Sequence, residues 1–302
     1  MEIKLLKFLE QHPQAKISAI NAYLEQTSID SLSQIGRINQ QNPGLIEQSY
    51  AQYTISQSLN WLNPQLLSRY LKLQDLDYSV KIIDQITSTN SYILNHVEQF
   101  PHHSILSCEW QFAGRGRFGR RWLTKIAHDL TVSLVYILPL SFNLALIPTI
   151  CAVALNRMLK NHSLSNFIKW PNDIYYQGTK VAGILVENLV RLGQNHTVIG
   201  IGLDNFHAWE RNKLLSELVA TVDNVLHEYE IFGFALLRRE WLDNCAHWHK
   251  EVIIKQGLRE LTRGIHTDIS ETGELIIKDN AGNYNSFASS VISLELSNSA
   301  QQ

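Results

Sequence analysis

Hydrophobic positions in the first sixty residues recur at helical spacing in three short segments and then alternate at 45–55, as in a hairpin. The segments are residues 3–9, residues 17–24 and a helix that is capped by Asp30 or Ser31 and carries Leu32, Ile35 and Ile38 on one face. Three helices and a hairpin are typical of a winged helix-turn-helix module, to which we assign residues 1–60.

After residue 60 the pattern changes to strands that alternate with helices. The predicted elements are strands at 80–86, 104–110 and 131–138, a three-strand meander at 167–176, 180–190 and 197–205, and helices at 87–100, 147–159, 214–229 and 234–248. We therefore expect residues 61–248 to form one central domain, a mixed sheet with helices.

Short strands separated by turn residues fill 249–296, which predicts a small SH3-like β-barrel over residues 249–302. A module of roughly 50 residues is near the lower limit of independent stability, so we expect it to pack against its neighbour. The whole chain is thus predicted to be an α+β protein in three parts.

No charged residue occurs from Leu130 to Asn156, a length that could span a membrane. Pro139 and Pro148 interrupt this stretch, however, and polar residues dilute it. A buried strand followed by a core helix explains it better, and we expect no membrane contact.

Composition is that of a globular protein, with 45% hydrophobic residues, 18% charged residues and a net charge of −2 over 302 residues. This balance excludes binding to nucleic acid through bulk positive charge. Residues 1–60 carry four basic side chains against five acidic ones, so operator binding is doubtful and a protein-contacting role stays open. Three widely spaced cysteines argue against a disulfide framework and favour a cytoplasmic protein.

The segment 113–122, AGRGRFGRRW, interleaves three glycines with four arginines. Its glycines spell the dinucleotide fingerprint G-x-G-x-x-G, but that motif must lead into a helix and this segment leads into a predicted strand. Guanidinium groups bind phosphate oxygens in pairs, so we interpret the segment as a mobile clamp for a phosphate-bearing ligand. A solvated basic loop is the alternative.

Three further motifs follow the same order along the chain as in one known family. KWPNDIYY at 169–176, KVAGILVE at 180–187 and IGIGLD at 199–204 join the arginine segment and STN at 88–90. Together they resemble the biotin protein ligase family from about residue 60 to the C-terminus. The resemblance implies a class II synthetase-like catalytic domain, and the N-terminal module resembles, more weakly, the repressor domain of bifunctional members.

The resemblance implies a two-step acyl transfer. Biotin and ATP, with Mg²⁺, form biotinyl-5′-AMP, and the biotinyl group passes to a lysine of a biotin carboxyl carrier domain, such as that of acetyl-CoA carboxylase. Both reacting groups of the first step are anionic, so fixed positive charge must offset their repulsion. The match gives this role to Lys180, with Arg115 and Arg117 on the carboxylate and phosphates. A lysine that reaches solvent is the alternative for Lys180.

The ureido head of biotin needs hydrogen-bond donors and acceptors, which a polar turn after the strand at 80–86 supplies. Ser88 and Thr89 in this turn fit ordinary helix capping equally well. Glycines in the meander leave room for a ligand, with β-bulges as the alternative. The expected biotin site is Ser88, Thr89, Asn90, Gln111, Arg115, Gly116, Arg117, Lys180, Gly183 and Gly200.

Asp173 is expected to hold Mg²⁺ or to orient an arginine, and Trp122 to pack beside the adenylate. Asp204 stands where the family usually carries Asn, and its charge would repel phosphate, so ATP affinity is in doubt. Glu295 stands where many members carry Arg, so we expect that contact to be absent. The expected ATP site is Arg117, Arg120, Arg121, Trp122, Asn172, Asp173 and Asp204.

Cys245, His247 and His249 alternate at the end of a predicted helix and could meet a zinc ion. A structural zinc site needs four ligands, and no partner cluster is visible in the sequence. We interpret this segment as a helix end entering the barrel.

The leading hypothesis is therefore a biotin protein ligase. A biotin-sensing repressor and a lipoate-type ligase are the alternatives; the GRGR segment favours biotin over lipoate, and SYAQY replaces the family's usual Gly-Lys-Gly-Tyr turn of the DNA-binding wing. In this family the catalytic sheet can pair edge to edge, so the resemblance also implies a homodimer.

Overall fold

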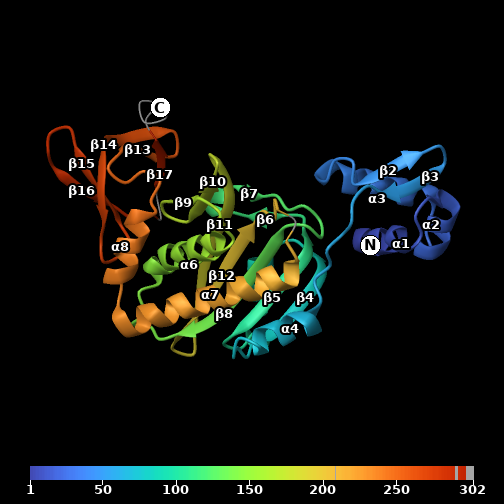
Figure 1. The fold of residues 1–302 in the computed structure, drawn as a ribbon, viewed down its shortest axis with the longest axis horizontal. Helices are drawn as coiled ribbons and strands as arrows, with labels where there is room; N and C mark the ends of the chain where they lie inside the picture. Colours follow the sequence, from blue (N-terminus) through green and yellow to red (C-terminus); the bar gives the residue numbers. More distant parts are fainter. Residues whose placement is uncertain (208, 290–291, 297–302) are drawn as a thin grey trace.

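The protein is described by a computed structural model over residues 1–207, 209–289 and 292–296. Figure 1 shows the N-terminal helices and small sheet at one end, a large sheet with its helices in the middle, and a second small sheet at the other end. The chain therefore has a mixed α+β fold around a central sheet.

Three helices and a three-stranded sheet form the N-terminal module. They are α1 (Glu2–Gln11), α2 (Ile17–Leu24) and α3 (Ser28–Gln41), with β1 (Ala15–Lys16), β2 (Ile46–Ser49) and β3 (Gln52–Ile55) in the order β1-β3-β2. The predicted helices and hairpin are confirmed. Two details were wrong: Thr27 caps α3, in a capping box with Asp30, and Leu32 is 47% exposed instead of packed.

The module packs on the central domain near the end of α3. The backbone N–H of Ile126 donates to Asn42 Oδ1 at 2.8 Å, and the indole N–H of Trp110 donates to Gln41 at 2.7 Å. Trp110, Ile126 and Ala127 belong to the same hydrophobic cluster as the core of α1. The two parts thus share buried apolar surface.

A seven-stranded sheet forms the central domain, in the order β4-β5-β8-β12-β11-β10-β9. Strands β4 and β5 are parallel, and the other neighbouring pairs are antiparallel. The strands are β4 (Ser79–Ile86), β5 (Ser104–Gln111), β8 (Leu130–Leu138), β9 (Asn166–Lys169), β10 (Asp173–Tyr176), β11 (Thr179–Arg191) and β12 (Gln194–Leu203). The predicted mixed sheet is confirmed.

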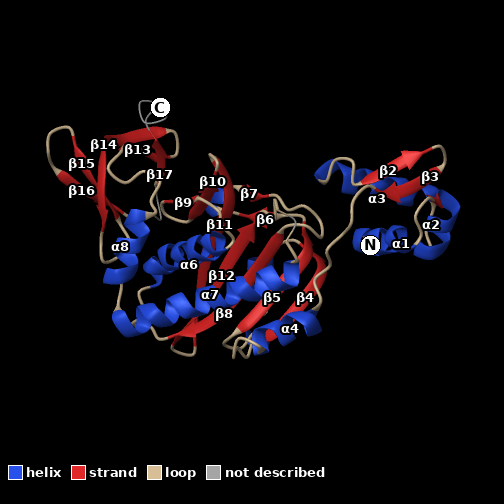
Figure 2. Cartoon of the chain, in the orientation of Figure 1, coloured by secondary structure: helices blue, strands red, loops and turns tan. Residues whose placement is uncertain are grey.

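Several helices lie across the near face of this sheet in Figure 2, and buried side chains form a core on each of its faces. A large core lies under α4 (Pro64–Lys72), α6 (Ile147–Asn161), α7 (Arg211–Phe232) and α8 (Ala235–Asp243), and a smaller one under α5 (Thr89–Asn95). Side chains alternate along a strand, so Leu134 of β8 joins the large core and its neighbour Val135 the small one. Burial on both faces explains why β8 is apolar throughout.

The uncharged stretch at 130–156 thus forms strand β8 and most of helix α6, as predicted. Within the residues that the structure describes, no helix combines the length and hydrophobicity that crossing a membrane requires.

Three predicted elements have different bounds. The stretch 167–176 forms two strands, β9 and β10, because Pro171 lacks the N–H that a continuous ladder needs. The helix predicted at 234–248 ends at Asp243. The chain then turns, and the backbone of Cys245 forms an isolated parallel β-bridge with Ile168 of β9. The helix predicted at 87–100 ends at Asn95 and is followed by the 3-10 turn Val97–Gln99; another such turn, Leu144–Leu146, precedes α6.

The C-terminal part is a five-stranded antiparallel sheet in the order β16-β15-β14-β13-β17. Its strands are β13 (Glu251–Gln256), β14 (Arg259–Ile269), β15 (Leu275–Asp279), β16 (Tyr284–Phe287) and β17 (Ser293–Leu296). Val252, Ile254 and Ile277 belong to the large core of the central domain. The sheet therefore packs against its neighbour, as expected for so small a unit.

Candidate active site

A cavity of about 290 Å³ opens between β10, β11, β12, the start of α5 and a short hairpin. The hairpin pairs β6 (Gly114–Arg115) with β7 (Arg121–Trp122) around the 3-10 turn Arg117–Gly119. Nearly all residues predicted for the site line this cavity: Ser88, Thr89, Asn90, Gln111, Arg115, Gly116, Arg117, Arg120, Arg121, Trp122, Asn172, Asp173, Lys180, Gly183 and Gly200.

One end of the cavity is polar but uncharged. Gln111 Oε1 accepts the backbone N–H of Thr89 at 2.9 Å, which ties β5 to the start of α5. The hydroxyl of Ser133 donates to Thr89 Oγ1 at 2.7 Å and to Asn90 Oδ1 at 2.5 Å. Ser88 caps α5 by accepting the N–H of Ser91, so the capping interpretation holds for Ser88. These groups form a rigid array of donors and acceptors at the sheet surface.

Two glycines of β12 make room for side chains that lie over the face of the sheet. A Cβ at Gly200 would collide with the amide of Asn90, and one at Gly202 with the indole of Trp122. Gly183 on β11 is similarly close to Lys180, with a Cβ 2.9 Å from its Nζ. The glycines thus let the side chains of Asn90, Trp122 and Lys180 lie directly against the strand backbone. The pairing of β11 with β12 is regular at Gly183 and Gly200, so neither glycine marks a bulge in this pair.

The arginine segment is a short hairpin whose guanidinium groups have protein partners. Arg115 lies 2.9 Å from Glu187, and Arg117 donates to Asn172 Oδ1 at 3.1 Å and to the Ser289 carbonyl. Burial lowers the pKa of Arg117 from its ordinary value. A positive φ of 57° at Phe118, unusual for a bulky side chain, tightens the turn.

Lys180, at the start of β11, points its ammonium group toward the cavity wall. Its Nζ lies 2.7 Å from Asp173 Oδ1 and 5.4 Å from the centre of the Trp122 ring, a cation–π contact. The side chain is 36% exposed, so it is neither fully buried nor free in solvent. Lys180 and Asp173 therefore lie together at the junction between the polar end and the arginines.

Asp204 is the one predicted site residue that the structure does not place in the cavity wall. It follows β12, where its N–H donates to the Val181 carbonyl at 2.9 Å. Burial and the neighbouring Asp129 raise the pKa of Asp204 to about 6. Its direct contact with ATP is therefore not supported by this geometry.

Glu295 pairs with Lys255 at 2.5 Å on the surface, while its neighbours Ser293 and Leu294 reach the cavity wall. The C-terminal sheet therefore contributes to the cavity through β17.

Of the alternating Cys245, His247 and His249, the structure groups the first two with His266 of β14. The segment is not a helix end, because α8 ends at Asp243. His266 lies 19 residues from His247, and nothing in the local sequence connects the two.

Sequence reasoning missed three residues that support the cavity: two through their side chains and one, Gly202, through the lack of one. Glu187 accepts from Arg115 and from Asn90, and Ser133 holds both Thr89 and Asn90. Gly202 repeats the role of Gly200 two residues along the same strand face. An isolated serine inside an apolar strand and the second glycine of IGIG were the signals available in the sequence.

The arrangement suits a ligand with a neutral polar head and an anionic end. The head meets amide and hydroxyl groups at the start of α5, and the anionic end meets Lys180 and Arg117. Since the two halves adjoin at Lys180, a bond formed between two anionic groups there would be electrostatically favoured.

Comparisons with known proteins agree with this chemistry. The sequence model of the "Biotin/lipoate A/B protein ligase family" matches residues 82–204, which include most of the cavity wall. The bifunctional ligase/repressor BirA of Escherichia coli is 31% identical over 242 residues, or 71% of this chain and 74% of BirA. The biotin–[acetyl-CoA-carboxylase] ligase of Paracoccus denitrificans is 27% identical, over 65% of this chain and 92% of that protein.

A solved structure of similar fold is the biotin protein ligase from Aquifex aeolicus in complex with biotin and ATP. It superposes with a TM-score of 0.62 over 72% of this chain and 99% of that one, at 22% sequence identity. At this level of identity the likeness concerns the fold.

Proposed function

Because this chain belongs to the biotin/lipoate A/B protein ligase family, among its biotin protein ligases, we propose that it activates biotin with ATP and transfers it to a carrier protein. A carboxylate oxygen of biotin attacks the α-phosphorus of ATP, pyrophosphate leaves, and biotinyl-5′-AMP forms. The amine of an acceptor lysine then attacks the acyl carbon and AMP leaves. This proposal rests mainly on one observation. At Lys180, the part of the cavity lined by uncharged polar side chains adjoins the part lined by arginines.

The neutral end is the biotin site in this proposal. Thr89 is hydrogen-bonded to Gln111, and Ser133 donates to both Thr89 and Asn90, so these orientations are set before a ligand arrives. The ureido group of biotin has two N–H donors and one carbonyl acceptor, which such an array can pair. Gly200 leaves room for the Asn90 amide against the backbone of β12, so that this amide is placed in the cavity wall.

Lys180 holds the carboxylate and the α-phosphate together. Two anions must meet in the first step, and a positioned ammonium group reduces their repulsion most in the transition state. Arg115, Arg117, Arg120 and Arg121 bind the carboxylate and the phosphates. In this proposal the ligand phosphates replace some of the present partners of these arginines, and the hairpin shields the mixed anhydride from water.

Asp173 is the candidate for Mg²⁺. Its carboxylate lies in the cavity wall beside Lys180, and Mg²⁺ commonly takes only one or two protein carboxylates along with substrate phosphates. The donor set fits the ion, which would neutralise phosphate charge when bound to ATP.

The terminal parts are assigned on the same basis. We assign residues 1–60 to a winged helix-turn-helix-like domain and residues 249–302 to an SH3-like barrel, supported by three helices with a hairpin and by five antiparallel strands. Residues 61–248 are the catalytic domain. Three free cysteines fit a cytoplasmic protein, and edge-to-edge pairing of the central sheet would give a homodimer.

DNA binding by the N-terminal domain is expected to be weak. Helix α3 carries a single basic residue, Arg37, which pairs with Glu2 at 2.8 Å. Ile29 and Leu32 are exposed on the same helix, which fits a protein contact better than phosphate. Filter binding to the organism's own biotin operator, with biotin and ATP present, should show weak binding whose affinity changes little with salt concentration. Tight binding that weakens steeply with added salt would contradict this.

The function is tested by incubating the full chain with ATP, Mg²⁺ and an apo carrier domain of acetyl-CoA carboxylase. With biotin, we expect the carrier to gain one biotinyl group by mass spectrometry and pyrophosphate to be released. Lipoate is the matched acid, and faster transfer of lipoate than of biotin would overturn the assignment.

A further inference from the structure

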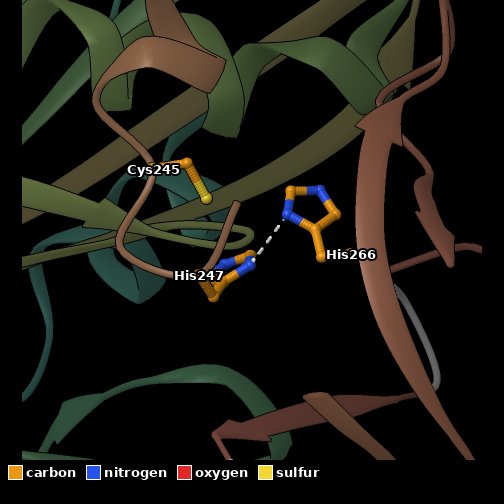
Figure 3. A group of neighbouring side chains, drawn as sticks. All are labelled: Cys245, His247 and His266. Atoms are coloured by element: carbon orange, nitrogen blue, oxygen red, sulfur yellow. Dashed lines mark hydrogen bonds between the residues drawn. The ribbon is translucent and has the colours of Figure 1, made fainter. Parts of the chain in front are cut away.

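Beside strand β9, a thiol and two imidazoles meet outside the cavity (Figure 3). Cys245 and His247 follow α8, and His266 comes from β14, so the group joins the central domain to the C-terminal sheet. Their ligand atoms all lie within 4.8 Å of one another, and both histidines are fully buried. The group has the composition of a metal site, so its hydrogen bonds must decide what it does.

The hydrogen bonds fix the positions of the ring protons. The backbone N–H of Trp170 donates to His247 Nε2 at 3.0 Å, so this nitrogen carries a lone pair. His266 Nε2 lies 3.0 Å from the Asp268 carbonyl oxygen and must therefore carry a proton. The two Nδ1 atoms are 3.2 Å apart, so His247 Nδ1–H donates to the free Nδ1 of His266. Two neutral imidazoles satisfy all four nitrogens.

The surroundings keep the pair neutral. Burial lowers the pKa of both histidines, that of His266 to about 4. The charged or titratable groups that act on the pair are Lys169 of β9, Asp268 of β14, and Lys250 and His249 in the turn after α8. Burial raises the pKa of the Cys245 thiol to about 12, so it stays protonated as well.

This proton arrangement opposes a metal centre. A metal-bound histidine normally donates its second ring N–H to an acceptor. His266 meets that condition through Asp268. Metal at His247 Nδ1 would move the ring proton to Nε2, where it would face the Trp170 N–H. Metal binding would therefore break the bond to Trp170.

The two N–H groups of Trp170 are bound by residues of this C-terminal region. Its backbone N–H is bound by His247, and its indole N–H donates to the Gly273 carbonyl in the turn between β14 and β15, at 3.2 Å. The side chain is 2% exposed. Both N–H groups of Trp170 thus depend on residues far along the chain.

Trp170 lies within a segment of the cavity wall that starts at Lys169. Trp170, Pro171 and Asn172 all line the cavity. Asn172 receives the hydrogen bond of Arg117 and donates to the Ile184 carbonyl at 2.6 Å. A shift of the Trp170 backbone would therefore displace the group that orients Arg117.

Building on the proposed function, we propose that His247 and His266 are positioning residues for the nucleotide end of the cavity. His266 fixes the tautomer of His247, and His247 holds the Trp170 amide so that Asn172 presents Arg117 to the phosphates. The position of Arg117 in the active site therefore depends, through this relay of hydrogen bonds, on His266, a residue of the C-terminal sheet.

Amide exchange in the full chain without substrates tests the first link. His247→Phe keeps an aromatic ring but removes the acceptor, and we expect exchange of the Trp170 amide to rise about tenfold or more. His247→Gln places an amide oxygen near the position of Nε2 and should restore slow exchange. Cys245→Ala is the matched control, because it alters the same cluster without touching the Trp170 bond. Equal exchange in His247→Phe and the wild type would overturn the proposal.

The second link is tested by pyrophosphate release at varied ATP and biotin. We expect His247→Phe and His266→Leu to raise KM for ATP about tenfold, with a smaller rise in KM for biotin, whose carboxylate Arg117 also binds. His247→Gln should recover the lower KM for ATP, and Cys245→Ala should keep it even if its melting temperature falls. An equal rise of KM in Cys245→Ala would reduce the pair to a structural role and overturn the proposal.

Two controls separate this inference from its alternatives. A wild-type chain that releases no pyrophosphate would refute the proposed function, whereas amide exchange would still report on the relay. Purified wild-type chain is also titrated with zinc alone; one tightly bound equivalent, lost in Cys245→Ala and His266→Leu, would overturn the relay in favour of a metal site.

Discussion

Two clusters of charged residues in the central domain differ in how far they are exposed to solvent. Arg211 is fully buried, and its guanidinium donates to Glu109 and to the carbonyls of Asn60 and Asp129. Lys180 in the cavity is 36% exposed and pairs with Asp173. The first cluster is closed, with no room for a ligand, whereas the second borders a cavity. Removing one partner of an enclosed pair leaves a buried charge uncompensated and destabilises the fold, whereas charge that borders open space is available for chemistry.

The closed cluster has a clear structural task. Glu109 also accepts the backbone N–H of Leu62 at 2.7 Å, so the pair fastens the linker at 60–62 to the end of β5 and the start of α7. This linker connects the N-terminal module to the central domain. The comparison therefore predicts that changes in the closed cluster alter stability, while changes in the open one alter activity.

The largest effect is expected for Arg211→Ala. It leaves the Glu109 carboxylate buried without its partner, which typically costs about 3–5 kcal/mol. Urea unfolding should show this loss. Arg115→Ala is the matched control, because its pair with Glu187 is partly exposed and should contribute about 0–1 kcal/mol. Equal destabilisation by the two variants would break the distinction between closed and open clusters.

For the open cluster, Lys180→Ala should lower kcat/KM for pyrophosphate release by about 10²–10³, since one preorganised charge at a developing anion is removed. Its unfolding free energy should stay close to that of the wild type. Lys213→Ala, on the exposed surface of α7, is the control and should leave both quantities unchanged. Retained activity in Lys180→Ala would remove the assignment of this residue.

The cavity and the core differed in how well the sequence predicted them. Periodicity located the strands of the central sheet, because a strand such as β8 that is buried on both faces is apolar throughout. Motif resemblance located Lys180 and the arginines. Neither source indicated that Glu187 would hold Arg115, since that contact joins residues 72 positions apart through the sheet.

Helix ends and long-range pairs were the weakest predictions. The helix predicted to reach 248 ends at Asp243, because the segment after it pairs with β9 instead of continuing the helix. His247 and His266 meet only because β14 folds back across that segment. Local patterns carry no signal for such tertiary contacts, which override helical spacing.

A smaller effect sharpens the role of open space in the cavity. Gly202→Ala would push a methyl group into the indole of Trp122, and overpacking of this kind costs about 1–3 kcal/mol. We expect kcat/KM to fall about tenfold as Trp122 moves. Gly36→Ala is the control, because nothing lies within 4 Å of a Cβ there. In α3 it should stabilise the chain by about 0.5–1 kcal/mol. Unchanged kcat/KM in Gly202→Ala would show that the position of Trp122 is unimportant.

The smallest effect concerns Asp204, which lies outside the cavity wall but interacts electrostatically with Lys180 of the open cluster. Burial first, and Asp129 second, raise its pKa to about 6 from 3.8, so the folded state disfavours the ionised form. Stability is therefore lost as pH rises from about 4 to about 6 and stays lost above that. Asp204→Asn removes the charge and should stabilise the chain at pH 7.5 by about 1 kcal/mol, a value reduced because water reaches the carboxylate.

The pH dependence of this stabilisation tests the raised pKa of Asp204 directly. At pH 4 the folded wild type is already protonated at Asp204, so the melting temperatures of Asp204→Asn and the wild type should converge there. KM for ATP should change less than about twofold, because Asp204 lies outside the cavity wall. A variant that is stabilised equally at both pH values would contradict the raised pKa. A severalfold fall in KM for ATP would instead show that the charge at Asp204 acts on the phosphates and belongs with the open cluster.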